Sequence, residues 1–363
     1  MLNSLNPIKD ASNQTDISDY DLGSARGQSA IESGLANAVW YQSDVPRKTI
    51  KEFMRRDDWP ADRDTLILFS VMAMSLVGIF ATYPSWWSTP FFLVYGVLYG
   101  SAMDSRWHEC GHGTAFKTFW KNNALYQIAS FMMLRNPVRW KWSHVRHHTD
   151  TIIVGRDPEI VATRPPSYWN LFVGFTGVAD TFNGLKTMLK NAVGEIDPSE
   201  KTYIPESEYG KLIFIARVWF LIYMAIVGLA VLYQSWLPIL LVGTPRIYGA
   251  WHHVLTGLIQ HAGLDEDVID HRLNSRTCYM NPVSRFIYWN MNYHCEHHMF
   301  PMVPYHQLPK LHEFLKPDLP KPYRSMWSAY KDIYKSLSIQ RTTDPSYALT
   351  PDMPDTAKPF KTI

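Results

Sequence analysis

The sequence predicts an all-α integral membrane protein with four transmembrane helices arranged as two hairpins. Long apolar runs of roughly spanning length occur in two pairs, and a turn of a few residues joins each pair. Both turns carry tryptophan and lack basic residues, as is typical of a membrane interface. The four predicted spans are Thr65–Tyr83, Trp86–Met103, Leu212–Leu232 and Leu237 to about Gly257.

The first hairpin leads directly to the first group of candidate ligands. Pro84 breaks the apolar run, and Trp86 and Trp87 occupy the turn. We expect the second helix to continue beyond Met103. It then delivers His108 and His112 just outside the lipid.

The second hairpin is less regular. Its turn, Tyr233–Trp236, is short, aromatic and uncharged, but the following span contains Pro245 and Arg246. A charge inside a span is costly and often functional. Arg246 is therefore a site candidate, although snorkelling or pairing within the bundle is the interpretation that we prefer.

The distribution of basic residues predicts the orientation. Neither outer turn contains Lys or Arg, whereas the residues on the other side include Arg47, Lys48, Arg55 and Lys117. The positive-inside rule then places both termini and all histidine clusters in the cytosol. We expect a multi-pass protein of the inner membrane in a bacterium, or of the endoplasmic reticulum in a eukaryote.

Composition excludes several other classes of protein. The net charge of +2 gives no reason to expect a nucleic-acid partner, and the three cysteines form no CxxC pair. The polar N-terminus does not resemble a cleavable signal peptide. We divide the chain into a polar N-terminal region with a short amphipathic helix (1–60), a membrane-bound domain (61–335) and a loose tail (336–363), and we expect residues 1–36 to be disordered or loosely attached.

Three histidine clusters carry the chemistry. Their spacings are HxxxH, HxxHH and HxxHH, and offsets of three and four residues place the rings on one helix face. Eight or nine imidazoles are too many for one ion and suit a pair. The chain lacks the thiolates of a structural zinc site, so we expect two iron ions and oxidative chemistry. The box residues are His108, His112, His144, His147, His148, His294, His297 and His298.

The first cluster also permits a different interpretation. His108-Glu109-Cys110-Gly111-His112 matches HExxH, in which two histidines bind zinc and the glutamate is the general base of a metalloprotease. A membrane protease is therefore an alternative hypothesis. It leaves both HxxHH clusters unexplained.

The three boxes, in this order around two hairpins, resemble the membrane-bound fatty acid desaturase family. The segments Trp142–Glu159 and His297–Pro309 are similar to the family's second and third box regions, and the resemblance covers roughly residues 60 to 335. It implies a four-helix membrane anchor with a cytosolic helical cap that holds two Fe²⁺ ions through histidine. It also implies a separate electron donor, a ferredoxin or small cytochrome with its reductase, because the chain contains no haem or iron–sulfur motif of its own.

The resemblance extends to further positions. His261 matches an additional metal-ligating histidine after the fourth span, with His252 and His253 as competitors deeper in the span. A water-holding asparagine of some members is replaced by Gly257. Asp157, Asn290 and Tyr293 are candidates for orienting ligand rings, with packing, or an Arg156 ion pair for Asp157, as the alternative. We expect His271, His306 and His312 to be ordinary surface residues.

The implied activity is an O₂-dependent oxidoreductase, most simply a desaturase that introduces a double bond into a fatty acyl or related aliphatic chain. A hydroxylase or monooxygenase is the first alternative, because a small change in substrate pose changes the outcome. A small non-lipid substrate, such as a modified amino acid or a rhizopine-like compound, is the second.

Overall fold

The computed structural model describes residues 16–362, and every regular element in that range is helical. Two isolated β-bridges, Thr277 with Tyr293 and Cys278 with Tyr323, are the extended pairings found there. The helices are α1 (Ala25–Glu32), α2 (Arg47–Phe53), α3 (Asp58–Thr82), α4 (Thr89–Val97), α5 (Met103–Gly111), α6 (Phe119–Met132), α7 (Pro137–Thr149), α8 (Tyr168–Phe175), α9 (Val178–Ala192), α10 (Tyr209–Leu232), α11 (Leu237–Leu241), α12 (Pro245–Gly249), α13 (Trp251–His261), α14 (His271–Asn274), α15 (Pro282–Tyr288), α16 (His294–Met299), α17 (Leu308–Leu315) and α18 (Met326–Thr342).

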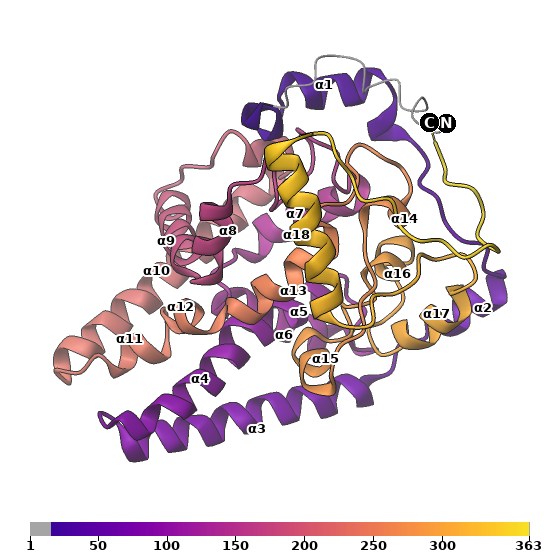
Figure 1. Cartoon of the computed structure of the whole chain (residues 1–363). Helices are drawn as coiled ribbons and strands as arrows, with labels where there is room; N and C mark the ends of the chain where they lie inside the picture. Colours follow the sequence, from indigo (N-terminus) through magenta and orange to yellow (C-terminus); the bar gives the residue numbers. More distant parts are fainter. Residues whose placement is uncertain (1–15, 363) are drawn as a thin grey trace.

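Two helical segments are long and apolar enough to cross a membrane, and both contain predicted spans. They are Arg47–Thr82, which includes α3, and Glu206–Leu232, which includes α10. Only 22% and 17% of their apolar stretches are buried inside the protein, so these side chains require an apolar surrounding other than the chain itself. Figure 1 shows α3, α4, α10 and α11 projecting from one end of the molecule.

The other two predicted spans are not uniform helices. The second consists of α4 followed by π-helical turns at Leu98–Ala102, which lead into α5. The fourth is divided into α11, α12 and part of α13. Helix α11 ends because Val242 is extended and Gly243 has a φ of 105°, and Pro245 then begins α12. Two of the four predicted transmembrane helices therefore meet the required length and hydropathy, and the number four remains a prediction.

Glycines allow the two hairpins to approach closely. A Cβ atom on Gly249 in α12 would lie 1.8 Å from the carbonyl oxygen of Gly96 in α4. Small residues permit such backbone contact between membrane helices. Ser101 strengthens the crossing, because its hydroxyl donates to the Gly249 carbonyl and accepts from the backbone N–H of His253 (2.9 Å). The crossing holds α13 beside the helix that continues to His108.

Arg246 is paired, but its partners lie outside the four predicted spans, so pairing within the bundle remains a prediction. Its side chain is buried, forms an ion pair with Asp180 and donates to the carbonyl of Met133. These contacts use both terminal nitrogens, and the Nε atom has no hydrogen-bond partner among the described residues.

The N-terminal segment is more ordered than its composition predicts. Residues 1–15 lie outside the described residues, but α1 follows soon after them. The Tyr20 hydroxyl donates to Glu266 (2.8 Å), and Arg26 pairs with Asp267 (2.6 Å). Both carboxylates are buried. The prediction of a loosely attached segment is therefore wrong from residue 16 onward, because buried partners far along the chain hold it.

The C-terminal residues also make specific contacts. Helix α18 crosses residue 335, where the predicted membrane-bound domain ends. Farther on, the backbone carbonyls of Lys358 and Pro359 accept hydrogen bonds from the buried Arg272 (3.0 and 2.9 Å). The division into three regions remains a prediction.

Candidate metal centre

Four helices bring all nine predicted ligands to one place. Helix α5 carries the first box, α7 the second and α16 the third, while His261 is the last residue of α13. His112 is the C-cap residue of α5. The three-and-four spacing places the rings of each box on one helix face, so they point toward a common interior.

The ring nitrogens form two groups rather than one. Within each group, one nitrogen from every residue lies within 4.8 Å of the corresponding atoms of the others. The second and third boxes each contribute to both groups, so neither group belongs to one helix. The first group is His108, His112, His144, His148 and His297, and the second is His147, His261, His294 and His298.

The shortest separations within the groups match a shared ion. The Nε2 atom of His144 lies 3.0 Å from that of His112 and 3.1 Å from that of His148. In the second group, Nε2 of His294 lies 3.0 Å from those of both His261 and His298. Two imidazole nitrogens that each lie about 2.1 Å from one metal ion have such a separation. The donor set therefore fits a metal in each group.

Two carboxylates orient rings of the second box. Asp157 Oδ2 accepts from His147 Nδ1 (2.8 Å), and Glu159 Oε2 accepts from His144 Nδ1 (3.1 Å). A carboxylate behind a ligating imidazole fixes the ring and raises its basicity. Arg156, the alternative partner for Asp157, pairs instead with Asp150 (2.9 Å).

Two further rings are fixed by uncharged acceptors. His261 Nδ1 donates to the backbone carbonyl of Asn274 (2.7 Å). The Thr151 hydroxyl gives its proton to the His147 carbonyl (2.7 Å), so it can accept from His298 Nδ1 (3.3 Å). In both rings the proton then lies on Nδ1, and the Nε2 lone pair faces the group.

Several ring nitrogens remain without a hydrogen-bond partner among the described residues. They include both nitrogens of His108 and the Nδ1 atoms of His148 and His297, all buried. Buried polar atoms normally find a partner, so the pair on His108 favours a ligand at this position. Histidine binds iron, copper, nickel and zinc alike, and iron is among the metals that an all-imidazole set accommodates.

Burial keeps most of these rings in the neutral, metal-binding form. Burial first, and then neighbouring histidines, lowers the pKa of His108 and His294 well below the ordinary value, and burial lowers the pKa of His261 to about 3. His147 differs. Burial opposes its charge, but the adjacent Asp157 carboxylate outweighs burial and raises the pKa of His147 to about 9.

Two histidines that we expected at the surface are buried beside the centre, so that prediction is wrong. His271 is 2% exposed, stacks on Trp40 with ring centres 4.2 Å apart, and lies 5.0 Å from the His298 ring. His312 is 1% exposed and pairs through Nδ1 with Glu296. The cause is that α14 and α17 both pack against α16. His306 is half-buried and belongs to neither group.

Other candidates lie outside the two groups. The Asn290 side-chain amide accepts from Arg285 (3.2 Å) and donates to the Tyr305 carbonyl (3.1 Å). Its hydrogen bonds are therefore made to groups other than the box histidines. His252 contacts the Ser284 hydroxyl at 3.1 Å.

His253 pairs with Asp104, with Nδ1 and Oδ2 3.0 Å apart, and it is in neither metal group. Tyr293 is buried with its ring 5.1 Å from that of His312, rather than against a box histidine. Sequence reasoning missed Glu159, Thr151 and Asn274 as orienting groups. Only Glu159, close behind the second box, carries a recognisable signal.

Glu109 does not face the histidines. Its Oε1 atom accepts from the Thr114 hydroxyl (2.7 Å) and the backbone N–H of Tyr305 (3.0 Å), and the residue belongs to neither group. Burial raises its pKa to about 7. A metalloprotease needs this carboxylate at a metal-bound water, so the arrangement disfavours the protease hypothesis.

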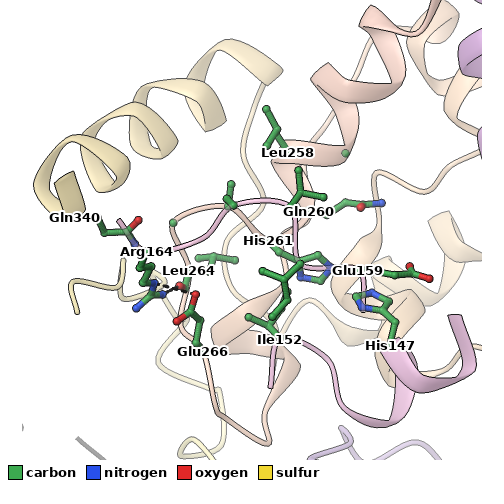
Figure 2. Close-up of a pocket in the computed structure, with 16 residues that line it drawn as sticks. His147, Ile152, Glu159, Arg164, Leu258, Gln260, His261, Leu264, Glu266 and Gln340 are labelled. Atoms are coloured by element: carbon green, nitrogen blue, oxygen red, sulfur yellow. Dashed lines mark hydrogen bonds and ion pairs between the residues drawn. The ribbon is translucent and has the colours of Figure 1, made fainter. Parts of the chain in front are cut away.

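A cavity of about 70 Å³ reaches the second histidine group. Figure 2 shows His147 and His261 on one side, with Arg164 and Glu266 farther away. Arg164 pairs with Glu266 at 3.2 Å. The lining mixes apolar with polar side chains: Ile152, Ile160, Val161, Leu258 and Leu264 are apolar, whereas Glu159, Gln260 and Gln340 are polar.

Comparison with known families decides the classification. The family model described as fatty acid desaturase matches residues 84–330, which is more than half of the chain. The chain belongs to the fatty acid desaturase family. A search of curated proteins finds no match. Membership in the desaturase family implies an oxidoreductase, and the two histidine groups fit a di-iron centre.

Proposed function

We propose that this desaturase-family protein is an O₂-dependent di-iron membrane oxidoreductase that introduces a double bond into a fatty acyl or related aliphatic chain. The observation that carries the proposal is the pair of histidine groups, five rings and four, with ring nitrogens within 4.8 Å in each group. Two neighbouring imidazole-rich positions suit the reduction of O₂ better than a closed structural zinc site does.

In this proposal each histidine group holds one iron ion. When bound, the two irons supply the reduction of dioxygen and the removal of hydrogen from an aliphatic C–H bond. Electrons come from a separate ferredoxin or small cytochrome with its reductase. The positive-inside rule favours an orientation in which the centre lies at the cytosolic face of the membrane, where such a donor can reach it.

The protein's own contribution is mainly orientation. Asp157, Asn274 and Thr151 keep protons on Nδ1 of their histidines, and they hold each Nε2 lone pair toward its group. The cavity ends at His147 and His261, so a substrate carbon placed there lies next to the second group. The apolar side chains in its mixed lining, such as Ile152 and Leu258, limit the access of water to that position.

A second candidate is oxidation of a small non-lipid compound by hydroxylation or desaturation. The observation that favours it is the polar end of the cavity, where Arg164, Glu266 and Gln340 lie together. A cavity of about 70 Å³ also suits a small group better than a long chain.

The test begins with metal analysis of detergent-purified protein. Two irons per chain support the proposal, whereas one zinc together with peptide cleavage overturns it. Profiling of cells that express the protein then separates the two candidates. A new unsaturated lipid supports acyl desaturation, and an oxidised water-soluble product with unchanged lipids supports the second candidate.

A further inference from the structure

We propose that α8 and α9 form a hairpin that lies in the membrane interface, with its exposed apolar face inserted among the lipids. No predicted span includes these helices. The proposal concerns the membrane contact alone, so it stands or falls independently of the reaction. The side chains that enter the lipid are Trp169, Phe172, Phe182, Leu189 and Val193.

The exposure of these side chains is the first observation. Trp169 is 70% exposed, Phe172 is 62% and Phe182 is 64%. Val193, directly after α9, is 78% exposed. A contiguous apolar surface of large side chains marks an interaction site, because water makes such exposure unfavourable.

The second observation is how α9 divides its surface. At about 100° per residue, Val178, Phe182, Leu189 and Val193 fall within an arc of about 60°. Leu185, Met188 and Ala192 occupy the neighbouring arc and pack against Ala216 and Trp219 of α10. Thr181 also falls in this neighbouring arc and is buried, and the other polar residues occupy the remainder of the helix. This helix has an apolar face much wider than its contact with α10 covers.

The third observation is the depth at which the apolar face of α9 lies in the membrane. Ala216 and Trp219 are four and seven residues beyond Leu212, where the apolar run of α10 begins. At 1.5 Å per residue they lie about 6 and 10 Å inside that run. The α9 face that packs against them is held at the same level. Interfacial helices place their apolar face about 5–10 Å into the boundary between headgroups and acyl chains.

Charge at the edge of the apolar face agrees with lipid as the occupant. Lys186 and Lys190 follow the exposed arc around the α9 helix, at about 80° and 120° from Val178. The Lys190 amine pairs with Glu195 (2.6 Å), so Lys186 is the lysine that can extend its amine to phosphate while its stem remains in apolar surroundings. On α8, the paired rings of Trp169 and Phe172, 5.9 Å apart, suit the same interface.

Single-cysteine labelling tests the proposal on the full chain. The native cysteines, Cys110, Cys278 and Cys295, are all buried, so an added surface cysteine reacts selectively. An environment-sensitive nitrobenzoxadiazole dye is attached at Phe182→Cys and, separately, at Leu189→Cys. The protein is placed in nanodiscs of phosphatidylcholine and phosphatidylglycerol with or without doxyl-labelled lipid. We expect doxyl lipid to quench both probes at least twofold.

Two matched controls show the quenching expected of a probe that faces water. Asn183→Cys lies on the exposed polar side of the same helix, and Val39→Cys replaces a 77% exposed residue outside the predicted spans. Both probes should be quenched by aqueous iodide and not by doxyl lipid. Phe214→Cys, 66% exposed on α10, should be quenched by the lipid. Lack of lipid quenching at both Phe182 and Leu189, while Phe214 is quenched, overturns the proposal. Shielding of the Phe182 and Leu189 probes from both quenchers also overturns it, since a protein partner then covers the face.

Discussion

Replacement of Asp157 by asparagine should weaken iron binding by about 10- to 100-fold while the chain still folds. The Asp157 side chain is fully buried and accepts three hydrogen bonds, each 2.8 Å long. Its Oδ2 atom accepts hydrogen bonds from His147 Nδ1 and the Ile152 N–H, and its Oδ1 atom accepts one from the Glu159 N–H. These bonds hold both the ring and the loop behind the second box.

The expected loss of iron affinity follows from the number of acceptor oxygens that remain in the Asp157→Asn variant. Asparagine has nearly the same volume as Asp157 but only one acceptor oxygen, so at least one of the three N–H donors faces an amide NH₂ instead. A hydrogen bond to a charged group contributes about 1.5–3 kcal/mol, and its loss corresponds to a factor of about 10 to 150. The His147 ring also loses the charge that fixes its tautomer.

The assay is chelator competition on purified protein, with iron content measured as the chelator concentration rises. Asp44→Asn is the matched control, because the Asp44 side chain is 85% exposed and its ion pair with Lys358 contributes little. Asp157→Asn should release iron at a 10- to 100-fold lower chelator concentration than Asp44→Asn. Equal release from the two variants would refute the view that Asp157 orients a metal ligand.

Three further predictions concern the centre and the fold. His298→Ala should lose iron and activity while membrane insertion persists, and full iron content by elemental analysis would contradict the ligand assignment. His312→Ala should lower stability by about 3–5 kcal/mol, because it leaves Glu296 as an unpaired buried charge; denaturant unfolding in detergent measures this, and an unchanged midpoint refutes it. Gly249→Ala should reduce the folded yield severely, since its Cβ would overlap the Gly96 carbonyl; size-exclusion chromatography in detergent shows the loss, and a normal monodisperse yield rejects the close crossing.

The ligands themselves could be predicted from the sequence because their pattern is local. Offsets of three and four residues place rings on one helix face whatever the rest of the fold does. The division into groups could not be predicted. His147 and His148 are adjacent yet join different groups, because the packing of α5, α13 and α16 around α7 decides which neighbour each ring meets.

The burial of His271 was beyond sequence reasoning for a related reason. It lies on the short polar helix α14, which has the composition of a surface loop, and its burial depends on Trp40, 231 positions earlier, and on the packing of α14 against α16. His312 differs, because it shares one face of α17 with Leu308 and Leu315 at helical spacing, a pattern that indicates burial from the sequence. The Asn274 carbonyl that orients His261 is a backbone atom, so no residue type could reveal it.

The attachment of the N-terminal segment sets an order of events during biosynthesis. The Tyr20 hydroxyl donates to Glu266 and accepts from the backbone N–H of Arg164, two residues that line the cavity. Glu266 follows Tyr20 by 246 positions, which a ribosome adding about 5–20 residues per second covers in about 12–50 s. One of the first segments to be made is therefore among the last to dock. Until then, the Tyr20 hydroxyl does not bridge Glu266 and the Arg164 backbone behind the cavity lining.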